Sequence, residues 1–245
     1  MIPKIIHYCW LSGDPIPEKL QRYMNTWKKH LPDYEFMLWD KSRFDIDACR
    51  WVRQAYDQKK YAFASDYIRF YALYHYGGIY LDMDVQVLKS YTPFLPLHTM
   101  VGYEDRSELL EVATFGAEKG LPWLKQIMEY YEMNDFVYDD EAMEKILCPP
   151  LVTRVLKQCG YRMVNVSSLA EALALADNEN LIPVFPCDYF CPKEWSSQLT
   201  DVTNQTYSIH HYAGSWMPEE IRKRRQMKER LPQWLLRLFL HLRKL

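Results

Sequence analysis

One stretch constrains the fold more than any other: two glycines followed by a short apolar run that ends in two acids, residues 77–84. A glycine pair typically ends a helix, and the apolar residues 79–81 favour a buried β-strand. Asp82 and Asp84 are two residues apart, so a strand that continued through them would point both carboxylates the same way. A strand that breaks at Met83 would let them converge at a sheet edge. Both geometries place two carboxylates at the end of a buried strand.

Such a carboxylate pair needs a positive partner. Burying two carboxylates unpaired would cost several kcal/mol, so a cation is expected nearby. Oxygen ligands with open positions suit Mg²⁺ or Mn²⁺ that bridges a substrate phosphate. The alternative is an acidic turn at a strand end, because an isolated Asp-x-Asp is common. A nuclease or phosphotransferase is disfavoured, since the sequence has neither a P-loop nor further acid clusters.

A predicted helix precedes this stretch. Asp66 and Arg69 are spaced i and i+3 within residues 62–76, so they share one helix face. The plain interpretation is an intrahelical ion pair, worth only about a few tenths of a kcal/mol. The functional interpretation is an acid that accepts hydrogen bonds from sugar hydroxyls, beside an arginine that contacts the donor. The small residues Ala64 and Ser65 would allow close approach.

The order of predicted elements indicates the fold class. A strand at residues 4–10, a helix at 17–30 and a strand at 34–39 form a βαβ unit, which is typical of a largely parallel sheet. Further strands are expected at 79–87, 99–103, 181–185 and 207–212, and further helices at 45–60, 121–131, 141–159 and 168–176. We therefore predict one α/β domain over residues 1–217, followed by a separate tail at 218–245.

Charge is unevenly distributed along the chain. The net charge is −2, but residues 222–245 contain nine Lys or Arg and one acid, which gives +8 there and −10 elsewhere. An acidic body argues against nucleic-acid binding. Within the tail, apolar residues recur at helical spacing: Leu231, Trp234, Leu235, Leu238, Leu242 and Leu245. A basic amphipathic helix of this kind suits an anionic membrane surface, and packing on its own domain or on a second subunit is the alternative.

Cysteines and the N-terminus bear on the compartment. The chain has six cysteines without a Cys-x-x-Cys pair, which favours reduced, partly buried thiols, although Cys187, Cys191 and a histidine would be a minimal zinc set. No signal peptide is recognisable and no run of about 18 apolar residues occurs. We therefore expect a cytoplasmic protein. His7 lies on a predicted core strand and is expected to be structural.

The combination of motifs resembles a known family. The residues Ala-Ser-Asp-Tyr-Ile-Arg at 64–69, followed by Gly-Gly-Ile-Tyr-Leu-Asp-Met-Asp at 77–84, resemble the DXD sugar-binding region of glycosyltransferase family 32. That family includes capsular and cell-surface polysaccharide transferases, and it is related to fungal initiating mannosyltransferases and clostridial glucosylating toxins. Residues 6–13 are similar to its opening strand and loop, and residues 211–216 to its closing segment. The resemblance covers about residues 2–217.

The resemblance implies both a fold and a reaction. The fold would be GT-A, a Rossmann-like αβα sandwich with a mostly parallel central sheet. The reaction would be metal-dependent and retaining, with Mn²⁺ or Mg²⁺ and a nucleotide-diphosphate sugar donor. A UDP-linked hexose or N-acetylhexosamine is expected, with GDP-mannose as the alternative donor. The acceptor would be a glycan or lipid-linked glycan of surface polysaccharide synthesis, at the inner face of the plasma membrane. A catalytically idle sugar-nucleotide-binding module is the rival interpretation.

The resemblance also assigns a metal site. Asp84 would be the direct metal ligand, and Asp82 would face the ribose or sugar, partly through metal-bound water. His211 would be the third protein ligand. His210 is adjacent, so the assignment between the two histidines stays open.

The resemblance assigns donor contacts as well. Asp66 and Arg69 would hold the donor sugar and ribose, and Trp10 would stack on the base. Ser215 and Trp216 would close over the diphosphate. Acceptor residues are not assigned by the resemblance.

Overall fold

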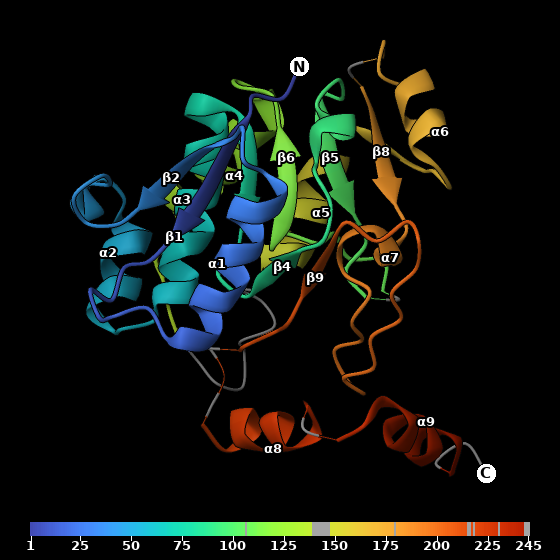
Figure 1. Ribbon diagram of the computed structural model, residues 1–245. Coiled ribbons are helices and arrows are strands. Elements are labelled where there is room, and N and C mark those ends of the chain that lie inside the picture. The colour runs from blue at the N-terminus through green and yellow to red at the C-terminus, as the bar shows by residue number, and fades with distance from the viewer. Residues whose placement is uncertain are drawn as a thin grey trace.

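The computed structural model describes residues 1–105, 107–138, 148–178, 180–214, 217, 219–229 and 231–242. Among them, a seven-stranded sheet with the order β2-β1-β3-β6-β5-β8-β7 forms the centre of the molecule (Figure 1). Its strands are β1 (Ile5–Cys9), β2 (Glu35–Trp39), β3 (Gly78–Leu81), β5 (Thr99–Gly102), β6 (Thr114–Ala117), β7 (Arg162–Asn165) and β8 (Leu181–Phe185). Only β6 runs against its neighbours, and the other pairs are parallel. The predicted α/β class with a mostly parallel sheet is confirmed.

Helices cover both faces of this sheet. One core cluster joins the sheet to α2 (Arg50–Asp57), α3 (Tyr61–Tyr76), α4 (Pro122–Met133) and α5 (Cys148–Gln158). The other joins it to α1 (Glu18–His30), α6 (Leu169–Ala174) and α7 (Cys187–Phe190). Strand β3 shows why: Tyr80 belongs to the first cluster, and its neighbours Ile79 and Leu81 belong to the second. Side chains alternate across a strand, so a fully apolar strand requires a core on each face.

The turn between α3 and β3 depends on glycine. Gly77 and Gly78 have φ values of +66° and +109°, a region that residues with a Cβ rarely adopt. A Cβ on Gly78 would lie 2.6 Å from the carbonyl oxygen of Ile5. His7 donates a hydrogen bond from Nε2 to the Gly77 carbonyl oxygen at 2.7 Å and accepts one at Nδ1 from Trp39 Nε1 at 3.0 Å. His7 therefore joins this turn to β1 and β2 through its two hydrogen bonds, which is a structural role.

The acid pair lies where the chain leaves the central sheet. The strand predicted over 79–87 is interrupted at the acids, which is one of the two geometries expected: β3 ends at Leu81, and β4 (Val85–Val87) begins a second sheet. There β4 pairs antiparallel with β9 (Ser208–His210). A turn closed by Val85 N–H donating to the Asp82 carbonyl oxygen at 3.0 Å separates the two strands. The acids thus occupy a bend rather than one face of a strand.

Several other expectations differ in detail. The helix predicted at 45–60 is a 3₁₀ turn, η1 (Ile46–Ala48), followed by α2, and a second such turn, η2 (Thr92–Phe94), precedes β5. The helix predicted at 141–159 is described from Cys148 onward as α5, and residues 141–147 lie outside the described part. Strands β6 and β7 were not predicted, because runs of four residues carry almost no periodicity.

The tail contains two helices, α8 (Glu219–Glu229) and α9 (Gln233–Leu242), so one continuous amphipathic helix over 218–245 is not confirmed. Pro232 precedes α9, and proline cannot continue a helix through its missing N–H. Helix α9 contacts the body, since Arg237 pairs with Asp201 at 2.7 Å and Gln233 Oε1 accepts from Thr200 N–H at 3.0 Å. Leu236 is buried. No helix among the described residues is both long and apolar enough to cross a membrane.

Candidate active site

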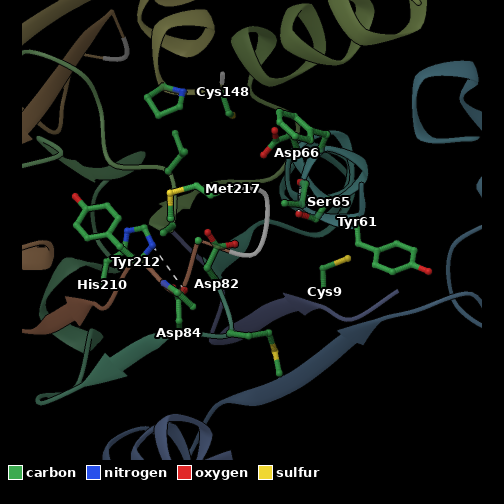
Figure 2. Close-up of a pocket in the computed structure, with 18 of the residues that line it drawn as sticks. Cys9, Tyr61, Ser65, Asp66, Asp82, Asp84, Cys148, His210, Tyr212 and Met217 are labelled. Carbon is green, nitrogen blue, oxygen red and sulfur yellow. Dashed lines mark hydrogen bonds and ion pairs between the residues drawn. The ribbon is translucent and has the colours of Figure 1, made fainter. Parts of the chain in front are cut away.

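A cleft of about 1060 Å³ opens where the parallel strands β1, β3 and β5 reach their carboxyl ends. This end of an open parallel sheet is where α/β proteins commonly bind ligands. Trp10 follows β1, and Asp82 and Asp84 follow β3. Helix α3 contributes Asp66 and Arg69 from another wall, and all five residues line the cleft. Figure 2 labels three of them, Asp66, Asp82 and Asp84.

The α3 residues form a buried charge network with the first acid. Arg69 Nη2 lies 2.8 Å from Asp66 Oδ1 and 3.5 Å from Asp82 Oδ1, and Nη1 donates to the Val112 carbonyl oxygen at 2.9 Å. Tyr80 donates from its hydroxyl to Asp82 Oδ1 at 3.0 Å. Burial raises the pKa of Asp66 to about 7, although Arg69 opposes this. Arg69 therefore lies between two carboxylates, Asp66 and Asp82, whereas the plain interpretation of the sequence is an ion pair with Asp66 alone.

The second acid, Asp84, is held by a segment that lies 127 to 129 residues further along the chain. Ala213 N–H donates to Asp84 Oδ2 at 2.5 Å, and His211 N–H donates to the Asp84 carbonyl oxygen at 3.1 Å. His210 Nε2 lies 3.6 Å from Asp84 Oδ1. Ligand atoms of Asp82, Asp84 and His210 all lie within 4.8 Å of one another. Two carboxylates and an imidazole so placed form a possible site for a divalent cation.

The structure brings His210, not His211, into this cluster. Successive side chains of an extended segment point to opposite sides, and Val85 pairs with His210 across the β4–β9 ladder. His211 faces away: its ring stacks on Tyr23 at 4.4 Å, and its Nε2 lies 3.0 Å from Gln86 Oε1. Burial lowers the pKa of His211 to about 4, so its ring is neutral at pH 7. The choice that the sequence left open between adjacent histidines is therefore set by strand register.

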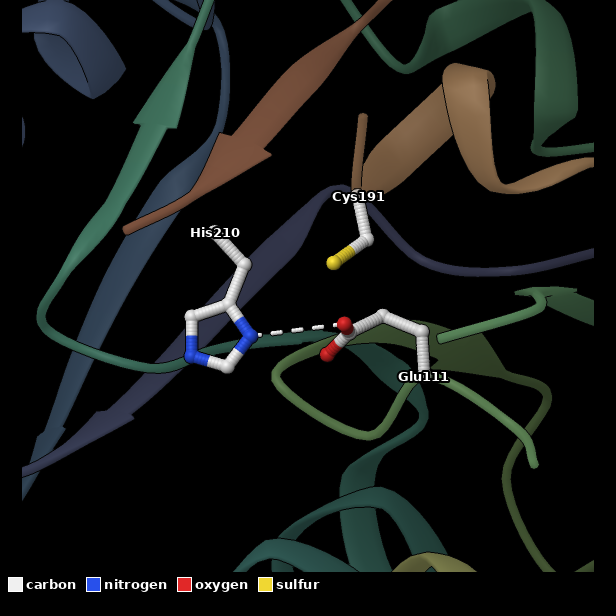
Figure 3. Close-up of side chains that lie close together, drawn as sticks. All are labelled: Glu111, Cys191 and His210. Atoms are coloured by element: carbon white, nitrogen blue, oxygen red, sulfur yellow. Dashed lines mark hydrogen bonds and ion pairs between the residues drawn. The ribbon is translucent and has the colours of Figure 1, made fainter. Parts of the chain in front are cut away.

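A third acid, Glu111, contacts the same histidine from the opposite side. His210 Nδ1 lies 3.3 Å from Glu111 Oε2, and Glu111 is almost completely buried. Cys191 Sγ belongs to the same group of possible ligand atoms (Figure 3). Burial alone would lower the pKa of His210, but the carboxylates of Glu111 and Asp84 raise it well above its usual range. Sequence reasoning missed Glu111, although an acid between apolar residues 109–110 and 112–113 was a visible irregularity.

Of the remaining predicted site residues, the structure describes one, Trp10. Trp10 is half-buried on the cleft wall, and its Nε1 donates to the Asp14 carbonyl oxygen at 2.8 Å. Ser215 and Trp216 lie outside the described residues. The cleft is also lined by basic side chains of helix α8, a contribution that the sequence did not reveal: Arg222, Lys223 and Arg225. The cleft is thus lined both by acidic residues, from α3 and from the turn after β3, and by basic residues from α8.

Comparison with known families places the acid pair in context. Residues 17–107 match the family described as a glycosyltransferase sugar-binding region containing a DXD motif. The matched residues, called the DXD region below, span α1 to the loop after β5 and thus include Asp66, Arg69, Asp82 and Asp84.

Named relatives agree with this match. Over 131 residues the chain is 36% identical to inositol phosphoceramide mannosyltransferase 3 of Schizosaccharomyces pombe, covering 52% of this chain and 36% of that protein. Over 99 residues it is 32% identical to mannosyl phosphorylinositol ceramide synthase SUR1 of Saccharomyces cerevisiae, covering 39% of this chain and 26% of that protein. The chain thus spans about a third or less of the length of these relatives.

Two solved structures that are named glycosyltransferases align with parts of this chain. The PaToxG glycosyltransferase aligns with a TM-score of 0.48 and 19% identity, covering 64% of this chain and 69% of that one. A glycosyltransferase involved in glycosylation of the major capsid of PBCV-1 aligns with a TM-score of 0.46 and 12% identity, covering 92% of this chain and 100% of that one.

Proposed function

We propose that this protein is a metal-dependent, retaining glycosyltransferase of GT-A architecture that uses a nucleotide-diphosphate sugar. The observation on which the proposal rests is the convergence of Asp82, Asp84 and His210 at the end of β3, beside the Asp66–Arg69 pair. The DXD region matched by sequence contains four of these five residues. A UDP-linked hexose or N-acetylhexosamine is the proposed donor, and a glycan or lipid-linked glycan of surface polysaccharide synthesis the proposed acceptor.

The donor set fits a divalent cation. Asp82 and Asp84 offer carboxylate oxygens and His210 one imidazole nitrogen, a mixture suited to Mn²⁺ and, less well, to Mg²⁺. The bound cation would neutralise the nucleoside diphosphate as it leaves. Asp84 is fixed for this task, because the Ala213 N–H occupies one of its carboxylate oxygens and leaves the other facing His210.

The chain's own residues would bind and orient the donor. Asp66 presents a buried carboxyl to sugar hydroxyls, and Arg69 holds Asp66 and Asp82 at fixed separation. Trp10, which lines the same cleft, offers a ring to the nucleotide base. The basic residues of α8 that line the cleft, Arg222 and Lys223, would attract phosphate oxygens.

A GDP-mannose-dependent reaction is the second candidate. The observation that favours it is the similarity to an inositol phosphoceramide mannosyltransferase and to a mannosyl phosphorylinositol ceramide synthase. A sugar-nucleotide-binding module without turnover is the third.

Donor hydrolysis separates these candidates. The full chain would be assayed with UDP- and GDP-sugars, in Mn²⁺ and again in EDTA. We expect one donor to be hydrolysed, with loss of turnover in EDTA. Asp84→Asn should lower that turnover at least 100-fold with an unchanged melting temperature, because an amide oxygen still accepts from Ala213 N–H. The exposed Asp177→Asn is the matched control. Near-normal turnover of Asp84→Asn would reject the metal assignment, and absence of turnover with every donor would favour the idle module.

The location of the protein is part of the same proposal. We place it in the cytoplasm, with the basic tail at the anionic inner face of the plasma membrane. Sedimentation with vesicles of phosphatidylcholine and phosphatidylserine tests this, using the chain with and without residues 219–245. Equal sedimentation of the two forms would reject the membrane role.

A further inference from the structure

We infer that Glu111 is the positioning residue that fixes the ring of His210 so that Nε2 is offered to the cation. The inference rests on the proposed function, since it concerns how the third protein ligand is oriented. Glu111 lies between β5 and β6, outside the DXD region matched by sequence.

The two ring nitrogens of His210 face two different acids. Nδ1 lies 3.3 Å from Glu111 Oε2, and Nε2 lies 3.6 Å from Asp84 Oδ1. An ionised carboxylate only accepts hydrogen bonds, so Nδ1 carries the proton in the contact with Glu111. In the neutral ring, the lone pair then belongs to Nε2, the nitrogen on the side of Asp82 and Asp84. A carboxylate behind a ligating imidazole commonly sets its tautomer and orientation.

Glu111 is itself held rigidly. Its side chain is 1% exposed, and Ala113 N–H donates to Oε1 at 2.6 Å. Oε1 of Glu111 therefore accepts from Ala113 N–H, and Oε2 faces His210 Nδ1. Figure 3 shows the contact between Glu111 and His210. An amide in this place can accept on only one side. With its oxygen toward Ala113, its NH₂ group would face Nδ1 and move the ring proton to Nε2.

Glu111→Gln tests this tautomer argument with Mn²⁺ alone as the probe. Mn²⁺ affinity of the full chain would be measured by electron paramagnetic resonance, and the ligating nitrogen detected by ¹⁴N modulation of the spin echo. We expect wild type to show histidine ¹⁴N modulation. Glu111→Gln should bind Mn²⁺ about 10- to 100-fold more weakly and lose the modulation. Glu104→Gln is the matched control, because Glu104 acts on His210 through its charge, with no hydrogen bond between the two among the described contacts. It should keep the modulation.

Glu111→Asp is a second variant, which keeps the inference testable if Glu111→Gln does not fold. An aspartate at this position keeps the charge and can still accept from the N–H two residues ahead, but it is one methylene shorter and withdraws from His210. It should fold and also lose ¹⁴N modulation. Wild-type affinity and modulation in both variants would overturn the role of Glu111 and leave the proposed function standing. Absence of Mn²⁺ binding by wild type would overturn both. A signal from Cys191 and Nδ1 in place of Nε2 would place the ion in the neighbouring Glu111–Cys191–His210 cluster and also overturn the inference.

Discussion

A neutral histidine buried beneath the turn that leads into the acid pair should make this protein sensitive to mild acid. His7 is fully buried, and both ring nitrogens are already in use. Nε2–H donates to the Gly77 carbonyl oxygen, so Nδ1 must accept from the Trp39 indole. A second proton would have to sit on Nδ1, facing the indole N–H. Burial lowers the pKa of His7 to about 4.

The sign and size of the effect follow from that pKa. In the unfolded chain a histidine has a pKa near 6.5, so between about pH 6.5 and pH 4 the unfolded state binds more protons than the native state. The contribution of His7 to the free energy of unfolding is complete above pH 6.5 and is lost as the pH falls toward 4. At about 1.36 kcal/mol per pH unit, the whole loss is about 3.4 kcal/mol, of which about 2 kcal/mol falls between pH 7 and pH 5.

Urea unfolding at pH 7 and pH 5 measures this loss. Other groups titrate in the same interval, so the informative quantity is the difference between wild type and His7→Gln, which cannot titrate. Wild type should lose about 2 kcal/mol more than the variant. At pH 7 the variant should be less stable by about 1–3 kcal/mol, because one of two buried hydrogen bonds is impaired. Equal losses in the two proteins between pH 7 and pH 5 would refute the reasoning.

Two further substitutions probe the elements around the acid pair. Gly78→Ala should destabilise the protein by about 2–4 kcal/mol in thermal unfolding, because the new Cβ meets the Ile5 carbonyl oxygen at a φ of +109°. Gly13→Ala, which has open space at a φ of +75°, should cost about 1–2 kcal/mol, and equal losses would contradict the close contact. Arg69→Met should cost about 3–5 kcal/mol at pH 8, since it leaves the Asp66 carboxylate buried without its cation. The loss should shrink at pH 5, where Asp66 is protonated in the variant, and a loss that does not change with pH would count against the pairing.

How far the sequence predicts this site depends on how local each part is. The acid pair and the Asp66–Arg69 pair lie within 19 residues on one helix, one turn and one strand, and simple spacing rules place them together. Local patterns likewise predict the first three elements: a β-rich run predicts β1, helical spacing predicts α1, and alternation predicts β2. These parts depend on short-range geometry alone.

The rest depends on long-range pairing. Which of His210 and His211 faces the acids is decided by the β4–β9 register, and no local pattern distinguishes two adjacent histidines. Glu111 joins the site only because β6 runs antiparallel between β3 and β5. The apolar spacing of the tail predicts one helix, yet the tail contains two, α8 and α9, with Pro232 between them.

The small β4–β9 sheet has a consequence for the order of folding. Asp84 and His210 belong to segments far apart along the chain, so their approach closes a very long loop and contributes contacts of high sequence separation. We expect such contacts to form late in folding, because the entropy of closing the long loop opposes them. A cation that binds both segments would stabilise the fully folded protein, because a partly folded chain without the β4–β9 pairing offers it only the acids and not His210. Metal occupancy would then report that the last strand has docked.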